Sequence, residues 1–159
     1  MQALVVYYSE TGNTETLAKA VASGLGTQAR KVDEVTPGEL KGYDLICLGT
    51  PVQGSAPARK VMDYISQWPN MSGKKAAVFC TMHMFGDKKV IQALKKTLEA
   101  RGMIFLGGYS ALGWSRLVAN FGPRIFNRGR PNRDELARAE EFGRNLLVKM
   151  QQPQITSIG

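Results

Sequence analysis

The sequence predicts an α/β fold in which helices cover both faces of a doubly wound parallel sheet. Apolar runs typical of strands alternate with segments of helical spacing along the whole chain, the pattern of a parallel sheet with helical crossovers. The apolar runs are nearly continuous, as in strands that are buried on both faces. The length of 159 residues suits one domain, which we place at residues 1–150, and residues 151–159 are expected to form a frayed tail.

Five runs are predicted as strands. The first is rich in Val and Tyr, and most of the others are mainly apolar, as in buried strands. The second run is short and polar, which suits the edge of a sheet. The predicted strands cover residues 2–8, 28–32, 43–49, 76–81 and 103–112.

Four segments have the spacing of helices, with apolar residues three or four positions apart. Pro57 suits the first turn of the second helix, and Gly102 ends the third. Asn132, followed three residues later by Glu135, predicts a capping box at the start of the fourth. The predicted helices cover residues 14–25, 57–68, 90–98 and 132–150.

Residues 113–131 have no clear periodicity, and about 19 residues without regular structure is long for a compact domain. The segment combines arginines with large apolar residues such as Trp114, Phe121 and Phe126. A purely solvated loop has no need of so many apolar side chains. We therefore expect part of this segment to pack over the carboxyl end of the sheet or against a partner.

The composition limits the classes of protein to consider. A net charge of +8 favours an acidic partner, a nucleic acid or a membrane surface, or serves solubility alone. No motif for nucleic-acid recognition accompanies the arginines, so we expect no nucleic-acid partner. Cys47 and Cys80 lie in apolar runs and are interpreted as reduced core residues. No signal peptide or membrane-spanning run is visible, so the expected location is the cytoplasm.

The loop after the first predicted strand has the chemistry of a phosphate site. Hydroxyl groups, an amide and the N–H groups of a helix start converge there, at the positive end of the helix dipole. The loop has no lysine, which excludes the triphosphate motif GxxxxGK[ST] and leaves a neutral cradle suited to a terminal monophosphate. A simple helix cap is the alternative interpretation. The loop consists of Ser9, Glu10, Thr11, Gly12, Asn13 and Thr14.

This loop, placed directly after a buried first strand, resembles the phosphate loop of flavodoxins, which bind FMN. The resemblance extends over nearly the whole chain in the order and spacing of the loops. It implies a three-layer flavodoxin-like fold with a five-stranded parallel sheet in the strand order 2-1-3-4-5. It also implies FMN at the switch between strands 1 and 3, which is where ligands bind in open parallel sheets.

By the same resemblance, the loops after the third and fourth strands flank the flavin ring. Apolar side chains in these loops would form its slot, and Phe85 is the best candidate for stacking. The peptide bond between Gln53 and Gly54 would turn its carbonyl toward flavin N5 and so separate the two one-electron steps. The first loop contributes Thr50, Pro51, Val52, Gln53 and Gly54, and the second Thr81, Met82, His83, Met84, Phe85 and Gly86.

The chain departs from the family in charge and in aromatic residues. Flavodoxins are usually acidic and hold the ring between a Trp and a Tyr, whereas these loops offer only Phe85 and the chain is basic. Trp114 either compensates or acts as a hydrophobic anchor. His83 either approaches the pyrimidine edge of the ring or is simply solvated. Trp68 fits a helix stripe and is expected in the core.

The sequence predicts an FMN-binding, low-potential, one-electron carrier between redox proteins. The alternative is a flavin-dependent oxidoreductase on the same scaffold, of the porphyrin-precursor dehydrogenase or quinone reductase type. A receiver module is excluded because residues 7–9 and 48–50 lack its acidic residues. One histidine and two separate cysteines build neither a Ser-His-Asp triad nor a Cys/His metal cluster, so no catalytic residue or metal site is predicted.

The predicted partners are acidic redox proteins that dock near the arginines of the segment 113–131. Surface charge of this kind raises association rates at low salt. An anionic membrane surface bearing a quinone is the alternative target. A structural loop whose arginines have no partner is the third interpretation. The arginines are Arg116, Arg124, Arg128 and Arg130.

Overall fold

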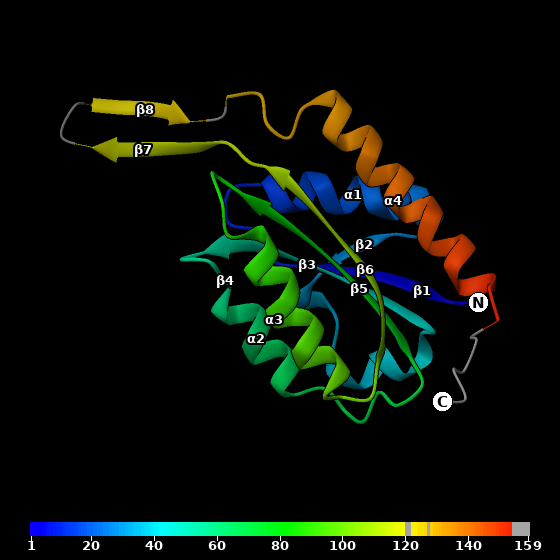
Figure 1. The fold of residues 1–159 in the computed structure, drawn as a ribbon. Coiled ribbons are helices and arrows are strands. Elements are labelled where there is room, and N and C mark those ends of the chain that lie inside the picture. The colour runs from blue at the N-terminus through cyan, green and yellow to red at the C-terminus, as the bar shows by residue number, and fades with distance from the viewer. Residues whose placement is uncertain (120–121, 127, 154–159) are drawn as a thin grey trace.

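A parallel sheet lies at the centre of the fold, between two layers of helices (Figure 1). The computed structural model describes residues 1–119, 122–126 and 128–153. The parallel strands are β1 (Ala3–Tyr7), β2 (Ala29–Lys31), β3 (Leu45–Gln53), β5 (Lys75–Met82) and β6 (Ile104–Leu112), in the spatial order β2-β1-β3-β5-β6. Counted among the parallel strands alone, this is the predicted order 2-1-3-4-5. The predicted fold class is confirmed.

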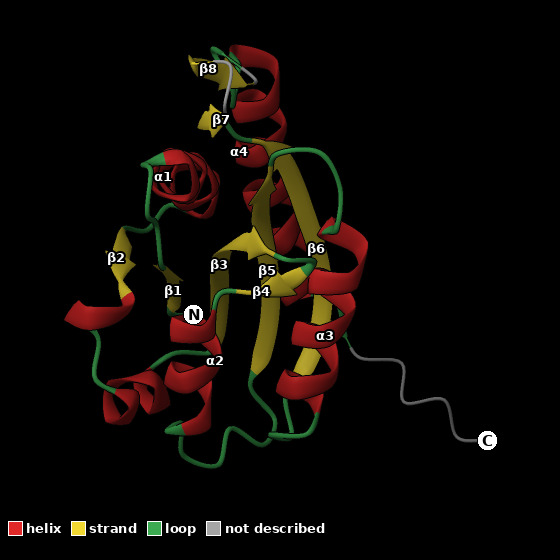
Figure 2. Ribbon diagram, turned by 90° about the vertical axis from the view of Figure 1, so that its left-hand side faces the viewer, coloured by secondary structure: helices red, strands yellow, loops and turns green. Residues whose placement is uncertain are grey.

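The helices cover the two faces of the sheet in pairs (Figure 2). One face carries α1 (Asn13–Leu25) and α4 (Arg133–Gln151), and the other carries α2 (Arg59–Ser66) and α3 (Asp87–Glu99). Two short 3₁₀ helices, Val32–Glu34 and Pro37–Gly42, follow β2. Glycines let α1 and α4 approach closely, since a Cβ on Gly24 would collide with the Glu140 carbonyl and one on Gly143 with the Val21 carbonyl.

Apolar side chains fill both spaces between the sheet and the helices. Leu17 and Val21 of α1 pack on one face of the sheet, while Ile65 and Leu94 are buried on the other. Full burial of such a side chain stabilises the fold by about 1.5–3 kcal/mol. Cys47 and Cys80 are buried and not in a disulfide, and Trp68 is buried, as predicted.

The connection after β3 differs from the prediction. The strand continues to Gln53, four residues beyond the predicted end at 49. It then turns at Gly54 and Ser55 and pairs with the short antiparallel strand β4 (Ala56–Pro57). The prediction that Pro57 opens a helix is therefore wrong. Pro57 pairs with Val52 in this hairpin, and α2 begins only at Arg59.

The segment after β6 also differs from the prediction. It contains two strands, β7 (Ser115–Ala119) and β8 (Gly122–Phe126), which pair with each other in an antiparallel hairpin. The pairing of the two strands satisfies their backbone polar groups. It requires no regular spacing of apolar residues, so no such pattern marks the hairpin in the sequence. The hairpin extends beyond the carboxyl end of the sheet (Figure 1), while Trp114 before it accepts a hydrogen bond from Asn13 at 2.7 Å. The expected packing of part of the segment over that end or against a partner stays a prediction.

The start of α4 follows the prediction. Asn132 Oδ1 accepts a hydrogen bond from the Glu135 N–H at 2.9 Å, and Glu135 Oε2 accepts one from the Asn132 N–H at 2.7 Å. The helix ends at Gln151, one residue beyond the predicted domain limit. Most of the predicted frayed tail, residues 154–159, lies outside the described residues. In the described part of the chain, no helix is both long and apolar enough to cross a bilayer.

Candidate functional site

The loop between β1 and α1 ends in a helix start that no side chain caps. Gly12 precedes the helix with φ +90°, and no side chain bonds to the N–H groups of the first turn. Two side chains bond to the backbone of Gly12: Ser9 Oγ accepts the Gly12 N–H at 3.1 Å, and the Thr16 hydroxyl donates to the Gly12 carbonyl at 2.9 Å. The first N–H groups of a helix have no partner within the helix. The loop therefore does not act as a simple helix cap. It leaves backbone N–H donors open at the positive end of α1.

Buried polar side chains gather at this edge of the sheet. Among the residues whose burial is described, these are Asn13, Thr14, Thr50 and Thr81. The Thr14 and Thr81 hydroxyls bond to each other at 2.8 Å, joining α1 to the end of β5. Thr50 Oγ1 accepts the Ala58 N–H at 2.9 Å and donates to the Pro51 carbonyl, so this hydroxyl orients the turn toward α2.

The side-chain amide of Asn13 uses its nitrogen in a hydrogen bond but not its oxygen. Its Nδ2 donates to the Trp114 carbonyl at 2.7 Å, while its Oδ1 is buried and has no partner among the described residues. The orientation of the amide is fixed, since a carbonyl accepts only and so requires Nδ2 to face Trp114. A buried acceptor without a donor costs about 1–3 kcal/mol. A ligand hydroxyl at this position would remove that cost.

The turn after β3 is tied to the phosphate loop. Gln53 Nε2 donates to Glu10 Oε1 at 2.6 Å, and the Tyr8 hydroxyl donates to the same oxygen at 3.2 Å. Gly54 has φ +56°, the left-handed conformation that glycine adopts without strain. Ser55 follows with φ +60°, and two such residues in succession form the tight turn of a two-residue hairpin.

The loop after β5 presents apolar side chains to solvent. Met84 is 66% exposed and Phe85 71% exposed. Gly86, with φ +105°, lies against the turn after β3, because a Cβ there would come within 3.0 Å of Ser55 Cα and of Val52 Cγ1. The two loops predicted to flank the flavin ring are therefore in direct contact at Gly86.

His83 contacts the residue that precedes Trp114. Its Nδ1 lies 3.2 Å from the Gly113 carbonyl, which only accepts, so Nδ1 is the donor in this contact. The Gly113 N–H in turn donates to the Met82 carbonyl at 2.8 Å. Trp114 is 38% exposed beside this loop. His83 is exposed, as in the solvated interpretation, but it has a defined contact.

The structure brings the three predicted loops to one edge of the sheet. Thr11 is exposed and Pro51, Val52 and Met82 are half-buried around the buried hydroxyls. Sequence reasoning missed the Asn13 contact to Trp114, because the two residues are 101 positions apart and only the fold joins them. It also missed the positive φ of Ser55, for which Gly54 beside a serine was the available signal.

A hollow of about 340 Å³ adjoins the phosphate loop on the β2 side and is lined in part by Ser9, Glu10 and Gly12. Three carboxylates, Glu10, Glu15 and Asp33, line this hollow beside one lysine, Lys31. Their net negative charge disfavours a phosphate dianion, so the side of the loop near Asn13 suits an anion better. Burial and a hydrogen bond to Glu15 raise the pKa of Tyr7 to about 12, so this hydroxyl stays protonated.

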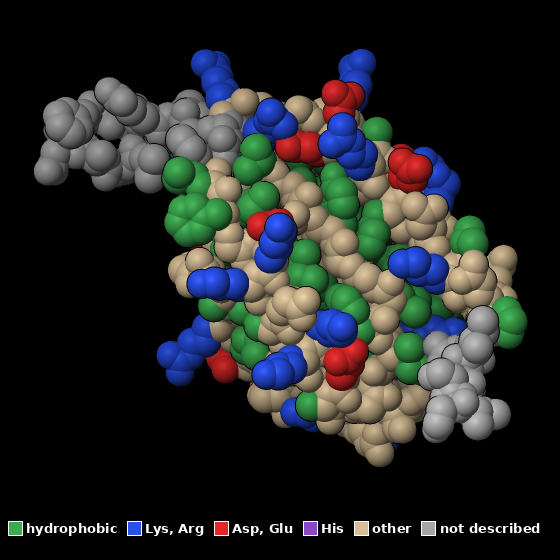
Figure 3. Space-filling view, in the orientation of Figure 1, with side chains coloured by type: hydrophobic (Ala, Val, Ile, Leu, Met, Phe, Trp, Pro, Cys, Tyr) green, Lys and Arg blue, Asp and Glu red, His purple; other side chains and the backbone are tan. Residues whose placement is uncertain are grey.

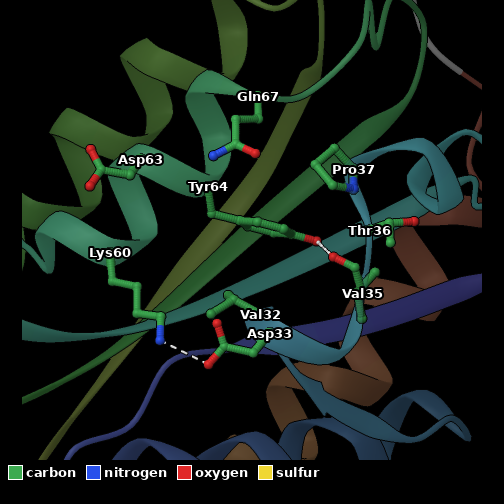
Figure 4. Close-up of a pocket in the computed structure, with 9 residues that line it drawn as sticks. All are labelled: Val32, Asp33, Val35, Thr36, Pro37, Lys60, Asp63, Tyr64 and Gln67. Carbon is green, nitrogen blue, oxygen red and sulfur yellow. Dashed lines mark hydrogen bonds and ion pairs between the residues drawn. The ribbon is translucent and has the colours of Figure 1, made fainter.

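A second hollow, of about 330 Å³, lies between the 3₁₀ helices and α2 (Figure 4). Lys60 Nζ contacts Asp33 at 2.8 Å across it, and the Tyr64 hydroxyl donates to the Val35 carbonyl at 2.9 Å. None of the predicted site residues lines this hollow. It lies outside the site formed by the three loops.

The site offers neither a reactive thiol nor a metal-binding cluster in its described residues. Burial, and to a smaller extent Asp87, raise the pKa of Cys80 to about 12, which keeps the thiol protonated. Among the described residues, no group of three or more His, Cys, Asp or Glu side chains is placed to hold a metal ion. The chemistry of this edge is that of a cradle for a phosphorylated ligand with an apolar part.

Comparisons with known proteins agree with this geometry. The flavodoxin family model matches residues 5–128. An uncharacterized protein of Methanocaldococcus jannaschii is 28% identical over 92% of this chain and 99% of its own length. An NAD(P)H dehydrogenase (quinone) of Paracoccus denitrificans is 30% identical over 72% of this chain and 71% of its own. The structure of oxidised flavodoxin 1 from Bacillus cereus superimposes with a TM-score of 0.74 at 21% identity, covering 96% of this chain and all of the other.

A family model that spans most of the chain and the matching strand order lead to one conclusion. The chain belongs to the flavodoxin family, whose members are flavin-binding redox proteins.

Proposed function

We propose that this protein binds FMN and carries single electrons at low potential between redox proteins. The observation that supports it most is the uncapped start of α1, with buried hydroxyls and an unsatisfied buried amide oxygen beside it. FMN carries both chemical groups that this cradle lacks, a phosphate that accepts hydrogen bonds and ribityl hydroxyls that donate them. The residues present fit the cofactor.

The phosphate end would be held by the loop before α1. The N–H groups of the first turn and the hydroxyls of Ser9, Thr11 and Thr14 are donors for a dianion. Thr14 and Thr81 share one hydrogen bond. The hydroxyl that accepts in this bond keeps its own proton and can donate it to a ligand. Asn13 Oδ1 would accept from a ribityl hydroxyl, which removes its desolvation cost.

The ring end would be held by the other two loops. Val52, Met84 and Phe85 offer apolar surface, and Phe85 offers a stacking face. Gly54 has a left-handed conformation, which would let the peptide bond between Gln53 and Gly54 turn its carbonyl toward a bound flavin. When bound, FMN supplies the capacity to take up and release electrons, and the protein orients it and tunes its potential.

A substrate-reducing enzyme is the second candidate. The relative from Paracoccus denitrificans is named as an NAD(P)H dehydrogenase (quinone), and the exposed Met84, Phe85 and Trp114 would suit an apolar substrate at the ring. A dehydrogenase of porphyrin precursors belongs to the same candidate class. The proposal of a carrier rests on the match of the flavodoxin family model to residues 5–128.

The proposed partners are acidic redox proteins that dock near the hairpin arginines. No acid occurs in residues 113–133, and Arg128 is exposed. The side chains of Arg116 and Arg124 lie outside the described part of the structure. Arg130 is engaged within the domain, since its Nη1 contacts Glu135 at 2.6 Å. An anionic membrane surface is the alternative target of the same charge.

We place this activity in the cytoplasm, where thiols stay reduced. Cys47 and Cys80 are both buried and free.

One experiment tests the cofactor and the reaction together. The purified protein is titrated with FMN, riboflavin and FAD, and the FMN-loaded form is then assayed with NADH and benzoquinone. Tight binding of FMN, much weaker binding of riboflavin and no steady turnover of NADH support the carrier. Steady turnover favours the enzyme, and equal binding of all three flavins contradicts the phosphate site.

A further inference from the structure

Exposed apolar side chains form a patch beside the cofactor loops. Met84, Phe85 and Trp114 are three of the large apolar residues that stay exposed in the described part of the chain. They lie together because the Gly113 N–H donates to the Met82 carbonyl at 2.8 Å, which places the start of the hairpin segment beside the loop after β5. A patch of this kind on a small protein marks an interaction site.

Two lysines adjoin the patch. α3 begins at Asp87, two residues after Phe85, so Lys88 and Lys89 lie in its first turn, and both are exposed. Asp87 lies between these lysines and the loop after β5, and it accepts a hydrogen bond from the Ser110 hydroxyl at 2.8 Å. Figure 3 shows Lys and Arg side chains on this face of the molecule, with hydrophobic side chains between them.

The stability of α3 does not account for these lysines. The first turn of a helix carries the positive end of its dipole, where cations are unfavourable and anions favourable. Lys88 and Lys89 therefore act against the helix that carries them, and together with its dipole they concentrate positive charge at the edge of the cofactor site. Such a charge attracts an anionic partner.

We propose that Met84, Phe85 and Trp114, with Lys88 and Lys89 at their border, form the docking patch for an acidic redox protein. The inference rests on the proposed function and adds a described surface to it. An apolar centre with a charged rim is the anatomy of a transient protein interface, and complementary charge accelerates the encounter. Only an electron passes from the reduced flavin to the partner's redox centre, and no covalent bond forms or breaks.

The test measures electron transfer from the FMN-loaded, reduced protein to an acidic [2Fe–2S] ferredoxin by stopped flow. The variant K88E/K89E is compared with the control K41E/K96E, which changes the net charge equally. Lys96 lies eight residues after Lys88 in α3, about 12 Å from it along the helix, and Lys41 lies in the second 3₁₀ helix. Each rate is divided by the rate with neutral benzoquinone, so that a change in the flavin itself cancels.

We expect K88E/K89E to slow transfer to the ferredoxin at least tenfold in 20 mM salt and less than twofold in 500 mM salt. The control should slow it less than threefold at either concentration. Equal slowing by both variants, or none by either, overturns the docking patch while the FMN and benzoquinone results still support the carrier. A wild-type protein that holds no FMN overturns the proposed function and this inference together.

Discussion

The phosphate end and the ring end of the candidate site are built in opposite ways. Asn13, Thr14 and Thr81 are buried and bonded into the fold, joining β5, α1 and the segment after β6. Met84 and Phe85 at the ring end are largely exposed, and they lie in a loop that contacts the neighbouring turn at Gly86.

This difference indicates a division of labour. A cradle made of fixed donors is preorganised, so it binds a phosphate without ordering new groups, and affinity should depend mainly on it. An exposed apolar loop can adjust to a flavin ring and to what meets it, so reactivity and partner choice should depend on that end. Substitutions at the two ends should therefore affect different measurements.

The largest effect is expected from the double change Thr11→Ala and Thr14→Ala. Each hydroxyl bond to a charged group contributes about 1.5–3 kcal/mol, so FMN affinity should fall at least tenfold. Riboflavin, which has no phosphate, should bind as it does to the wild type. Isothermal titration with both flavins measures this.

Thr97→Ala is the matched control for that change. The Thr97 hydroxyl donates to the Ala93 carbonyl at 2.8 Å and lies on α3, away from the loop before α1. Its removal should leave FMN affinity within twofold. An equal loss of riboflavin and FMN affinity in the double variant would show that these hydroxyls serve the fold rather than the phosphate.

The next effect is expected at the ring end, from Phe85→Ala. Aromatic stacking contributes about 0.5–1.5 kcal/mol, so the affinities for FMN and riboflavin should both fall by about two- to tenfold. Phe85→Tyr keeps the stacking face and should restore both. A loss confined to FMN would contradict the division of labour, because Phe85 would then act on the phosphate end.

A smaller effect on binding, with a larger one on potential, is expected from Gly54→Val. A residue with a β-carbon disfavours the left-handed conformation by about 1–2 kcal/mol, so the carbonyl before Gly54 should turn toward N5 less readily. The gap between the two one-electron reduction potentials should narrow by about 40 mV or more, since 59 mV is tenfold for one electron. A redox titration followed by absorbance measures the gap.

Gly73→Val separates this effect from backbone strain in general. Gly73 has φ +80° and open space around it, but it precedes β5 at the opposite edge of the sheet. The change should destabilise the fold to a similar extent and leave both potentials unchanged. An unchanged gap in Gly54→Val would end the peptide-turn idea without affecting FMN binding.

The same contrast explains what the sequence could predict. The loop before α1 is one continuous run, so Ser9, Gly12 and Thr14 could be predicted as phosphate ligands from local chemistry alone. The capping box of Asn132 was local in the same way. The bonds that complete the site join distant residues, as from Asn13 to Trp114, and no local pattern reports them.

The hairpin of β7 and β8 was missed for a related reason. Its strands pair only with each other, and arginines and apolar residues alternate in them without a regular period. The extension of β3 to Gln53 was missed because Pro51 interrupts the apolar run. Hydrophobic periodicity detects runs of regularly spaced apolar residues, and neither of these segments presents such a run.

The smallest effect is expected from Glu15, which frames the phosphate end. The Tyr7 hydroxyl at the end of β1 donates to Glu15 in the first turn of α1 at 3.0 Å, and this bond is the main cause that lowers the pKa of Glu15. A carboxyl group with a lower pKa in the folded chain stabilises the fold above its unfolded pKa, and the contribution is lost as the pH falls through the folded pKa. Glu15→Gln should therefore lower the free energy of unfolding slightly at pH 7 and by less at pH 3. Urea unfolding at both pH values measures the difference.

In the background Tyr7→Phe, the effect of Glu15→Gln should shrink, because the bond between the two side chains is already absent. A penalty that is equal at pH 7 and pH 3 would mean that the charge of Glu15 does not hold the loop in place.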